Sequence, residues 1–322
     1  MLSSAFRLIA LTVVASLAAC AAPPSPETIF GIQQRELDDL KLAYYSDYVS
    51  FIGRDSQGIV AFALDTNRGR DQDTWQADHF VVLYDEQTGW QPIRGNGPYP
   101  NDSHQLETIP DSPHFGYRGT PQAWWHIRSP TNSLDLHAEP VQFHIDRQQG
   151  LAKYRLGSAG AALTLGNRVI EGRIIYEYLF LPGFNRLSRR YVGSLKGFHG
   201  LYLAVDGGAG DLYLHRQSGQ GFSPLIGQTD GFLALAGMQG PLSALTLDLS
   251  ATRPAIGFYR WPAAWQGTFT SGPSPYTFRL ELSERHQVAN WLVGGFAMGL
   301  VRGTLDTPDG PKQLIGLGEL II

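Results

Sequence analysis

From Tyr45 to the C-terminus the chain is a succession of short β-prone runs separated by glycines and prolines, with no long helical period between them. In the run SLDLHAE, residues 133–139, the two leucines would point to one side of a strand, and Asp135 and His137 to the other. Such alternation is typical of antiparallel sheets that rest one face on a core. The sequence therefore predicts an all-β fold built as sandwiches or barrels.

One α-helix is expected before these strands, in residues 30–45, which read FGIQQRELDDLKLAYY. The segment contains good helix formers, and four of its apolar residues fall roughly on one face of a helix: Ile32, Leu37, Leu40 and Tyr44. We expect this to be the one long helix of the folded part.

Two pairs of segments repeat in the same order along the chain. YVSFIGRDSQGIVAFALD, residues 48–65, matches YVGSLKGFHGLYLAVD, residues 191–206, and LYDEQTGWQPI at 83–93 matches LYLHRQSGQGFSPL at 212–225. The repeat favours two related lobes, although hairpins also share turn residues for purely local reasons.

With the lobe boundary placed near residues 182–188, we expect a first domain over 31–184 and a second over 185–322. Each would be an antiparallel β-sandwich or barrel, and the second would follow the first along the chain.

The N-terminus has the pattern of an export signal. A short basic segment over residues 1–7 is followed by an apolar stretch over 8–17, which is too short to span a bilayer as a helix. The stretch ends in LAAC, residues 17–20, which resembles a bacterial lipobox. The resemblance implies a signal peptide over 1–19 and a lipid on Cys20; the alternative is an ordinary cleaved signal with a coincidental cysteine.

The resemblance also predicts where the protein resides. Residues 20–30 would form the lipid anchor and a proline-rich linker, and the membrane would be a partner through lipidated Cys20. Because Ala21 rather than aspartate follows the cysteine, the lipobox resemblance favours the periplasmic face of the outer membrane, within the bacterial cell envelope.

Composition and the absence of certain motifs argue against several other classes of protein. Cys20 is the one cysteine in 322 residues, so the exported domain has no disulfide and depends on its core. A formal net charge of −4 shows no basic surplus, which argues against a nucleic-acid partner. No phosphate-binding loop, dinucleotide-binding glycine motif or nucleophile elbow is present, and we expect no cofactor.

Residues 44–90, YYSDYVSFIGRDSQGIVAFALDTNRGRDQDTWQADHFVVLYDEQTGW, resemble the first strands of the lipocalin-like proteins grouped with AttH and bacterial carotenoid 1,2-hydratase. The ending PKQLIGLGELII, residues 311–322, is similar to their closing strand, which often reads Gly-Tyr-x-Glu-Leu. The resemblance implies two lipocalin-like barrels and an apolar ligand. It supplies no catalytic residue, because the His-rich and Tyr-Trp-Glu elements of the hydratases are missing.

Acid–base chemistry has one good candidate from the residues themselves. In IIYEYLFL, residues 174–181, Ile175, Glu177 and Leu179 share one face of a strand. If that face is buried, the pKa of Glu177 rises and the carboxyl can donate a proton near neutral pH. The alternative is that Glu177 faces solvent or pairs with an arginine such as Arg173. His79 is the second candidate proton donor.

Ligand-binding candidates lie in two places. The segment 66–77, TNRGRDQDTWQA, is predicted to be an inserted loop that closes over a ligand, with Arg68 and Arg70 holding an anion and Trp75 covering an apolar body. A surface loop with internal ion pairs explains the same residues.

Aromatic residues supply the other ligand-binding candidates. Trp124 and Trp125 are adjacent in a strand, so we expect one in a core and the other in a cavity or interface. Tyr178 completes the ligand-binding set.

A metal site is not expected. The nine histidines form no His-x-His or His-Glu-x-x-His pair, and isolated strand histidines such as His126, His137 and His144 are usually structural.

The function that these features favour is the binding of an apolar or amphipathic small molecule, such as a lipid or an isoprenoid. The first alternative is an acid-catalysed hydratase, cyclase or isomerase acting on such a ligand. The second is an envelope scaffold that makes only protein contacts.

Overall fold

The computed structural model describes residues 28–29, 32–33, 39–92, 94–100, 116–183, 197–218, 225–235, 238–254, 260–291 and 294–321. Cys20 and the expected signal and anchor lie outside these ranges. The described residues form strands and turns, with one 3₁₀ turn at Pro130–Asn132 and no α-helix. Consequently, none of them belongs to a helix with the length and apolar character needed to cross a membrane.

The first sheet has eleven antiparallel strands, in the order β6-β5-β4-β3-β13-β12-β10-β9-β8, with β7 on β5 and β11 on β12. Its strands are β3 (Leu42–Asp55), β4 (Gly58–Asp71), β5 (Thr74–Asp85), β6 (Gly89–Trp90), β7 (Arg94–Pro100), β8 (Gly116–Thr120), β9 (Trp124–Ser129), β10 (Leu134–Ala138), β11 (Gln142–Gln149), β12 (Ala152–Leu165) and β13 (Arg168–Pro182). A separate two-stranded ribbon joins β1 (Thr28–Ile29) to β2 (Ile32–Gln33).

The second sheet has nine antiparallel strands, in the order β17-β16-β15-β14-β22-β21-β20-β19-β18. They are β14 (His199–Val205), β15 (Gly210–Arg216), β16 (Thr229–Leu235), β17 (Met238–Pro241), β18 (Asp248–Pro254), β19 (Arg260–Ser271), β20 (Ser274–Trp291), β21 (Gly294–Thr307) and β22 (Gly310–Ile321). Just after β17, the backbones of Ser243 and Thr270 exchange hydrogen bonds of 3.0 and 2.8 Å, which ties the two ends of this sheet together.

The two sheets repeat one topology, as the sequence predicted. In each, the first strand pairs with the last: β3 with β13, and β14 with β22. The residue match behind that prediction is nevertheless wrong by one strand. It aligned residues 58–65, which form β4, with residues 200–206, which cover β14, the structural counterpart of β3.

Two local predictions are wrong. The expected helix over 30–45 is strand at both ends of its range, because Ile32–Gln33 form β2 and residues 42–45 begin β3; residues 34–38 lie outside the described part. The expected loop over 66–77 is the far end of the β4–β5 hairpin, whose turn lies at 72–73. Backbone pairing therefore fixes residues that looked like a mobile lid.

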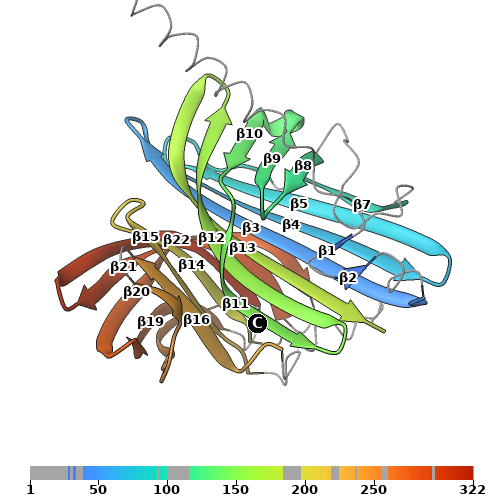
Figure 1. Cartoon of the computed structure of the whole chain (residues 1–322). Coiled ribbons are helices and arrows are strands. Elements are labelled where there is room, and N and C mark those ends of the chain that lie inside the picture. The colour runs from blue at the N-terminus through green and yellow to red at the C-terminus, as the bar shows by residue number, and fades with distance from the viewer. Residues whose placement is uncertain are drawn as a thin grey trace, which may run out of the picture.

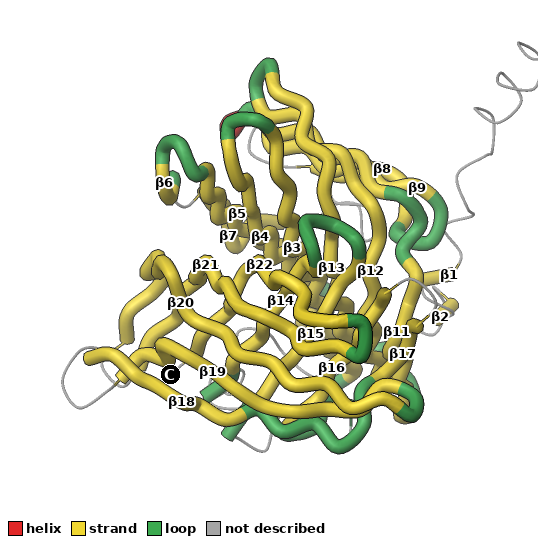
Figure 2. Tube along the Cα trace, turned by 90° about the vertical axis from the view of Figure 1, so that its left-hand side faces the viewer, coloured by secondary structure: helices red, strands yellow, loops and turns green. Residues whose placement is uncertain are grey.

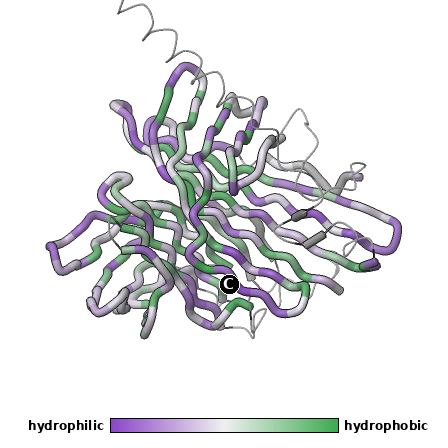
Figure 3. Tube along the Cα trace, in the orientation of Figure 1, coloured by the Kyte–Doolittle hydropathy of each residue, from purple (hydrophilic) through white to green (hydrophobic). Residues whose placement is uncertain are grey.

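Hydrophobic and hydrophilic residues alternate along many strands (Figure 3), and the buried apolar side chains form three large cores. One lies on the inner face of the first sheet, around Phe51, Leu64 and Trp125. Another lies inside the second sheet, around Leu203 and Phe278. The third, which we call the interlobe core, joins the outer face of β3, β4, β12 and β13 to β14, β15 and β22 where the sheets pack together (Figures 1 and 2).

Candidate functional site

Strand β13 places Glu177 in the interlobe core. Its neighbours on the same face, Ile175 and Leu179, are 3% and 5% exposed, whereas Tyr176 and Phe180 point into the core of the first sheet. Glu177 is therefore a carboxyl in an apolar wall, as expected if this face of the strand is buried. The wall faces the second sheet rather than the interior of the first.

A tyrosine of the second sheet meets this carboxyl. The hydroxyl of Tyr202, on β14, donates a hydrogen bond to Oε2 of Glu177 at 2.7 Å. The same hydroxyl lies 3.3 Å from Oε2 of Glu319, on β22. Two carboxyls that are far apart in sequence thus converge on one phenol; we call Glu177 and Glu319 the interlobe carboxyl pair.

Aromatic rings surround the pair. The rings of Tyr48 and Tyr213 lie 4.6 and 5.0 Å from the ring of Tyr202, centroid to centroid, and all three tyrosines are at most 5% exposed. Glu177 and Glu319 themselves are only half-buried. The carboxyl pair therefore lies within a largely buried aromatic patch of the interlobe core.

The surroundings shift the proton equilibria of both carboxyls. Burial raises the pKa of Glu177 to about 7, against the opposing effect of the hydrogen bond from Tyr202. Burial, followed by repulsion from Glu177, raises the pKa of Glu319 well above its ordinary value. Because two carboxylates this close in a poorly hydrated place cannot both ionise cheaply, the pair holds at least one proton at neutral pH.

This arrangement can transfer a proton. A protonated Glu319 can donate to the phenol oxygen of Tyr202 while the phenol donates to Glu177, so a proton can pass between the two carboxyls. Carboxyls whose surroundings separate their pKa values are suited to paired acid and base roles.

His79 cannot act with Glu177 at one centre, because the two side chains lie on opposite faces of the first sheet. His79, 4% exposed, points to the inner face. On that face the guanidinium of Arg68 forms a buried ion pair with Asp47, and the hydroxyl of Tyr176 donates to Oδ1 of Asp47 at 2.5 Å. The charge of Arg68 is therefore balanced within the protein by Asp47, and its predicted contact with an anion stays a prediction.

Three more of the predicted ligand-binding residues lie in the core of the first sheet. Trp75, Trp125 and Tyr178 are 8%, 2% and 1% exposed, and Trp125 packs edge-on against Tyr176. Arg70 places its guanidinium 5.2 Å from the centroid of the Trp75 ring, within one hairpin. These side chains stabilise the sheet, and they do not converge with Glu177.

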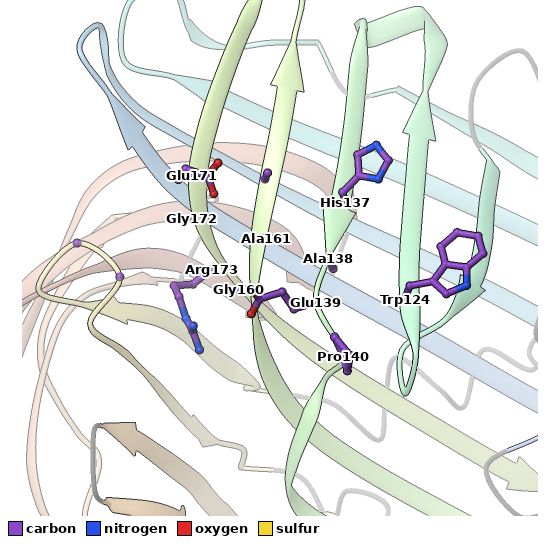
Figure 4. Close-up of a pocket in the computed structure, with 13 residues that line it drawn as sticks. Trp124, His137, Ala138, Glu139, Pro140, Gly160, Ala161, Glu171, Gly172 and Arg173 are labelled. Atoms are coloured by element: carbon purple, nitrogen blue, oxygen red, sulfur yellow. The ribbon is translucent and has the colours of Figure 1, made fainter. Parts of the chain in front are cut away.

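Trp124 points the other way, as its adjacency to Trp125 predicted. It is 45% exposed and lines an open surface groove of about 610 Å³ between β10, β12 and β13 and the β14–β15 turn (Figure 4). His137, Glu139, Glu171 and Arg173 line the same groove. Arg173 also forms an ion pair with Asp211 across the two sheets, so it is not the partner of Glu177.

Sequence reasoning missed Tyr202 and Glu319. Glu319 had the same signal as Glu177, a lone carboxylate within an apolar run, LIGLGELII. The side chain of Tyr202 carried no such signal, because a tyrosine in an apolar strand is most often a core residue.

No protein-family model matches the sequence, and no curated protein sequence is detectably similar to it. Solved structures do match. Kievitone hydratase from Nectria haematococca superposes with a TM-score of 0.57 at 12% identity, covering 86% of this chain and 88% of that chain.

A candidate AttH from Nitrosomonas europaea gives a TM-score of 0.57 at 11% identity, over 93% of this chain and 99% of the other. CghA gives 0.50 at 13% identity, over 94% and 93%. At these identities the likeness concerns the fold alone. The chain has the tandem, lipocalin-like all-β fold of the AttH-like proteins, which confirms the resemblance carried by its first strands and its closing strand.

Proposed function

We propose that the protein is an enzyme that adds water to, or removes it from, an apolar or amphipathic small molecule by proton transfer at the interlobe carboxyl pair. The observation that carries the proposal is the meeting of Glu177 and Glu319, from different sheets, at the hydroxyl of Tyr202. A purely structural contact between sheets has no need of two half-buried carboxyls competing for one donor.

In the hydration direction, protonated Glu177 gives its proton to one end of a carbon–carbon double bond. Water adds to the other end, and the proton that this water loses returns to the Glu177 carboxylate, so the enzyme is regenerated. The pKa of Glu177, about 7, suits both halves of the cycle, because a group poised near the working pH can donate and accept. The buried tyrosines beside Glu177 keep its carboxyl poorly hydrated, which keeps this pKa raised.

Two further observations favour an enzyme over the simple carrier that the sequence favoured. The described inner faces of both sheets hold packed cores, and the interlobe carboxyl pair lies between the sheets. A protein of the same fold is named a hydratase, which supports water addition as the reaction class.

The test is the substitution Glu177→Gln, which keeps the side-chain shape and removes the transferable proton. The substrates to assay are a panel of linear isoprenoid alkenes and their tertiary alcohols, with mass spectrometry following the gain or loss of isotope-labelled water. We expect wild-type turnover of at least one pair and a loss of at least about a hundredfold in E177Q. Glu171→Gln, an exposed glutamate on the same strand, is the matched control and should keep full activity.

Substrate binding, measured by quenching of tyrosine and tryptophan fluorescence, should be nearly unchanged in E177Q. Equal turnover in E177Q and wild type would remove the carboxyl from the mechanism. A wild type that binds members of the panel and converts none would return the protein to the class of carriers.

We also propose that the protein is anchored in the cell envelope by a lipid on Cys20. The support is the LAAC sequence at the end of an apolar stretch of signal length. Cells that produce the full chain and are fed labelled palmitate should yield labelled protein in the membrane fraction. Cys20→Ser should abolish the label; a labelled C20S protein, or unlabelled wild type, would contradict the anchor.

A further inference from the structure

Two histidines and an aspartate converge on the outer face of the β9–β10 hairpin. His126 and His137 are direct cross-strand partners, and Asp135 precedes His137 by two residues on the same strand face. Oδ1 of Asp135 lies 2.5 Å from Nε2 of His126 and 3.2 Å from Nε2 of His137. The imidazole rings stack with centroids 4.1 Å apart, and one donor atom from each of the three residues lies within 4.8 Å of the other two.

The sheet fixes this geometry. Trp125 and Ile127 flank His126, and Leu136 separates Asp135 from His137. All three apolar residues are at most 2% exposed and pack in the core of the first sheet. Strand pleating then directs His126, Asp135 and His137 outward together. On the far side of β10, the partner of His137 is Ala162, which is too small to cover the imidazole.

We propose that His126, Asp135 and His137 form a binding site for a divalent transition-metal ion of the zinc class, separate from the interlobe carboxyl pair. Imidazole nitrogens and a carboxylate oxygen are ligands that zinc accepts at about 2.0–2.2 Å. Ligands at that distance in a tetrahedral site stand roughly 3.3 Å from each other. The observed separations of 2.5 and 3.2 Å therefore need only small rotamer adjustments to hold an ion.

Three protein ligands leave at least one coordination position open. The side chains of His126, Asp135 and His137 are 19%, 38% and 64% exposed, so solvent reaches the site. His137 also lines the groove described above, on the strand paired with the one that carries Trp124 (Figure 4). An ion held here would stand at the rim of that groove, where water or an anionic group in the groove could complete its coordination.

One neighbouring group opposes the ion. Nε of Arg128 lies 3.8 Å from Oδ2 of Asp135, and its positive charge would repel a bound cation. The histidines contact the other oxygen, Oδ1, so the guanidinium does not block the coordinating side of the carboxylate. Removing the charge of Arg128 should therefore tighten metal binding, whereas an ordinary His–Asp ion pair predicts no such effect.

The experiment uses full-length, tag-free protein stripped with a chelator and titrated with zinc by isothermal calorimetry at neutral pH. We expect binding of about one ion per chain, weakened at least tenfold in His126→Asn, His137→Asn and Asp135→Asn. His286→Asn, which removes a histidine elsewhere, should leave the affinity unchanged. Arg128→Gln should bind more tightly than wild type.

Cobalt(II) supplies a second readout, because its visible absorption reports nitrogen and oxygen ligation. Wild type loaded with cobalt should show a spectrum that H137N lacks. No binding at submillimolar zinc, or equal binding by wild type, H126N and H137N, would overturn the site. Circular dichroism of each variant confirms that the sheet persists, so weakened binding cannot come from unfolding.

Discussion

At the scale of single residues, the interlobe carboxyl pair is a feature that costs the folded protein stability. Glu177 and Glu319 are brought together by strands of different sheets, and each loses hydration there. Removing a carboxylate from water disfavours its charged form, so the folded protein takes up protons that the unfolded chain would release. A site arranged in this way reduces stability at neutral pH in exchange for a group that can transfer protons.

This linkage predicts that stability falls as pH rises. The pKa of Glu177 is about 7 in the folded protein against 4.5 in an unfolded chain, so the folded state binds more protons between these values. Its contribution to the free energy of unfolding is greatest below about pH 4.5 and is lost as pH rises through about 7. Between about pH 5.5 and about pH 8 the loss amounts to about 2 kcal/mol, to which Glu319 adds in the same direction.

Urea unfolding of wild type and E177Q at both pH values measures this contribution. Burial also lowers the pKa of His144 to about 4 and that of His199 to about 3, so both histidines favour unfolding as pH falls and oppose the trend. They are present in both proteins, and the difference between wild type and E177Q cancels them. E177Q should gain stability over wild type mainly at the higher pH; a gain that does not change with pH would contradict the raised pKa.

The residue pattern predicted one half of this site and missed the other. Alternation in IIYEYLFL shows which side chains share a face with Glu177, because the period of a strand is local. What that face meets depends on the packing of two sheets, and Glu319 is 117 residues from the tyrosine that joins it to the site.

At the scale of elements, the seam between the first and last strands of each sheet positions the site. In the second sheet, Leu203 on β14 faces Gly316 on β22. A Cβ atom on Gly316 would lie 1.8 Å from the carbonyl oxygen of Tyr202 and 2.7 Å from Cα of Leu203. The absence of a side chain there is what lets β22 approach the strand that carries Tyr202.

Gly316→Ala should therefore separate the seam and displace Tyr202 from Glu177. We expect a loss of about 2–3 kcal/mol in the free energy of unfolding, typical of overpacking a closely fitted region, and a parallel loss of turnover. Gly318→Ala, on the same strand, is the control, because its Cβ would meet only side-chain methyl groups at 3.1 Å and beyond. Chemical unfolding of both variants checks this; equal stability would show that the seam is not constrained at Gly316.

The failures of prediction at this scale have physical causes. Tyr44 and Tyr45 are both buried, one in the interlobe core and one inside the first sheet, so this end of β3 does not alternate between apolar and polar residues. A strand that is buried on both faces lacks the alternating pattern, so the spacing of its apolar residues can match one face of a helix. The duplicated segments were misaligned by one strand because turn residues recur in every hairpin, while the pairing of first and last strands is a long-range property.

At the scale of the whole molecule, the two sheets are joined by an apolar core crossed by ion pairs. Nε of Arg173, on β13, donates to the carboxylate of Asp211, on β15, at 3.1 and 3.2 Å, and Arg147 pairs with Asp230. Asp211 is fully buried, and burial raises its pKa despite the facing guanidinium. The pair therefore orients the sheets more than it stabilises them, because its desolvation cost offsets most of the attraction.

The balance between the desolvation cost and the attraction of the Arg173–Asp211 pair leads to the last prediction. Arg173→Met leaves the Asp211 carboxylate buried without its counter-charge and should cost about 3 kcal/mol at about pH 8. The cost should shrink at about pH 5, where Asp211 can take up a proton instead. The double variant Arg173→Met with Asp211→Asn removes both charges and should recover to within about 1 kcal/mol of wild type. Urea unfolding of the single and double variants at both pH values completes the cycle. If the double variant is as unstable as the single one, the pair stabilises the packing of the two sheets outright.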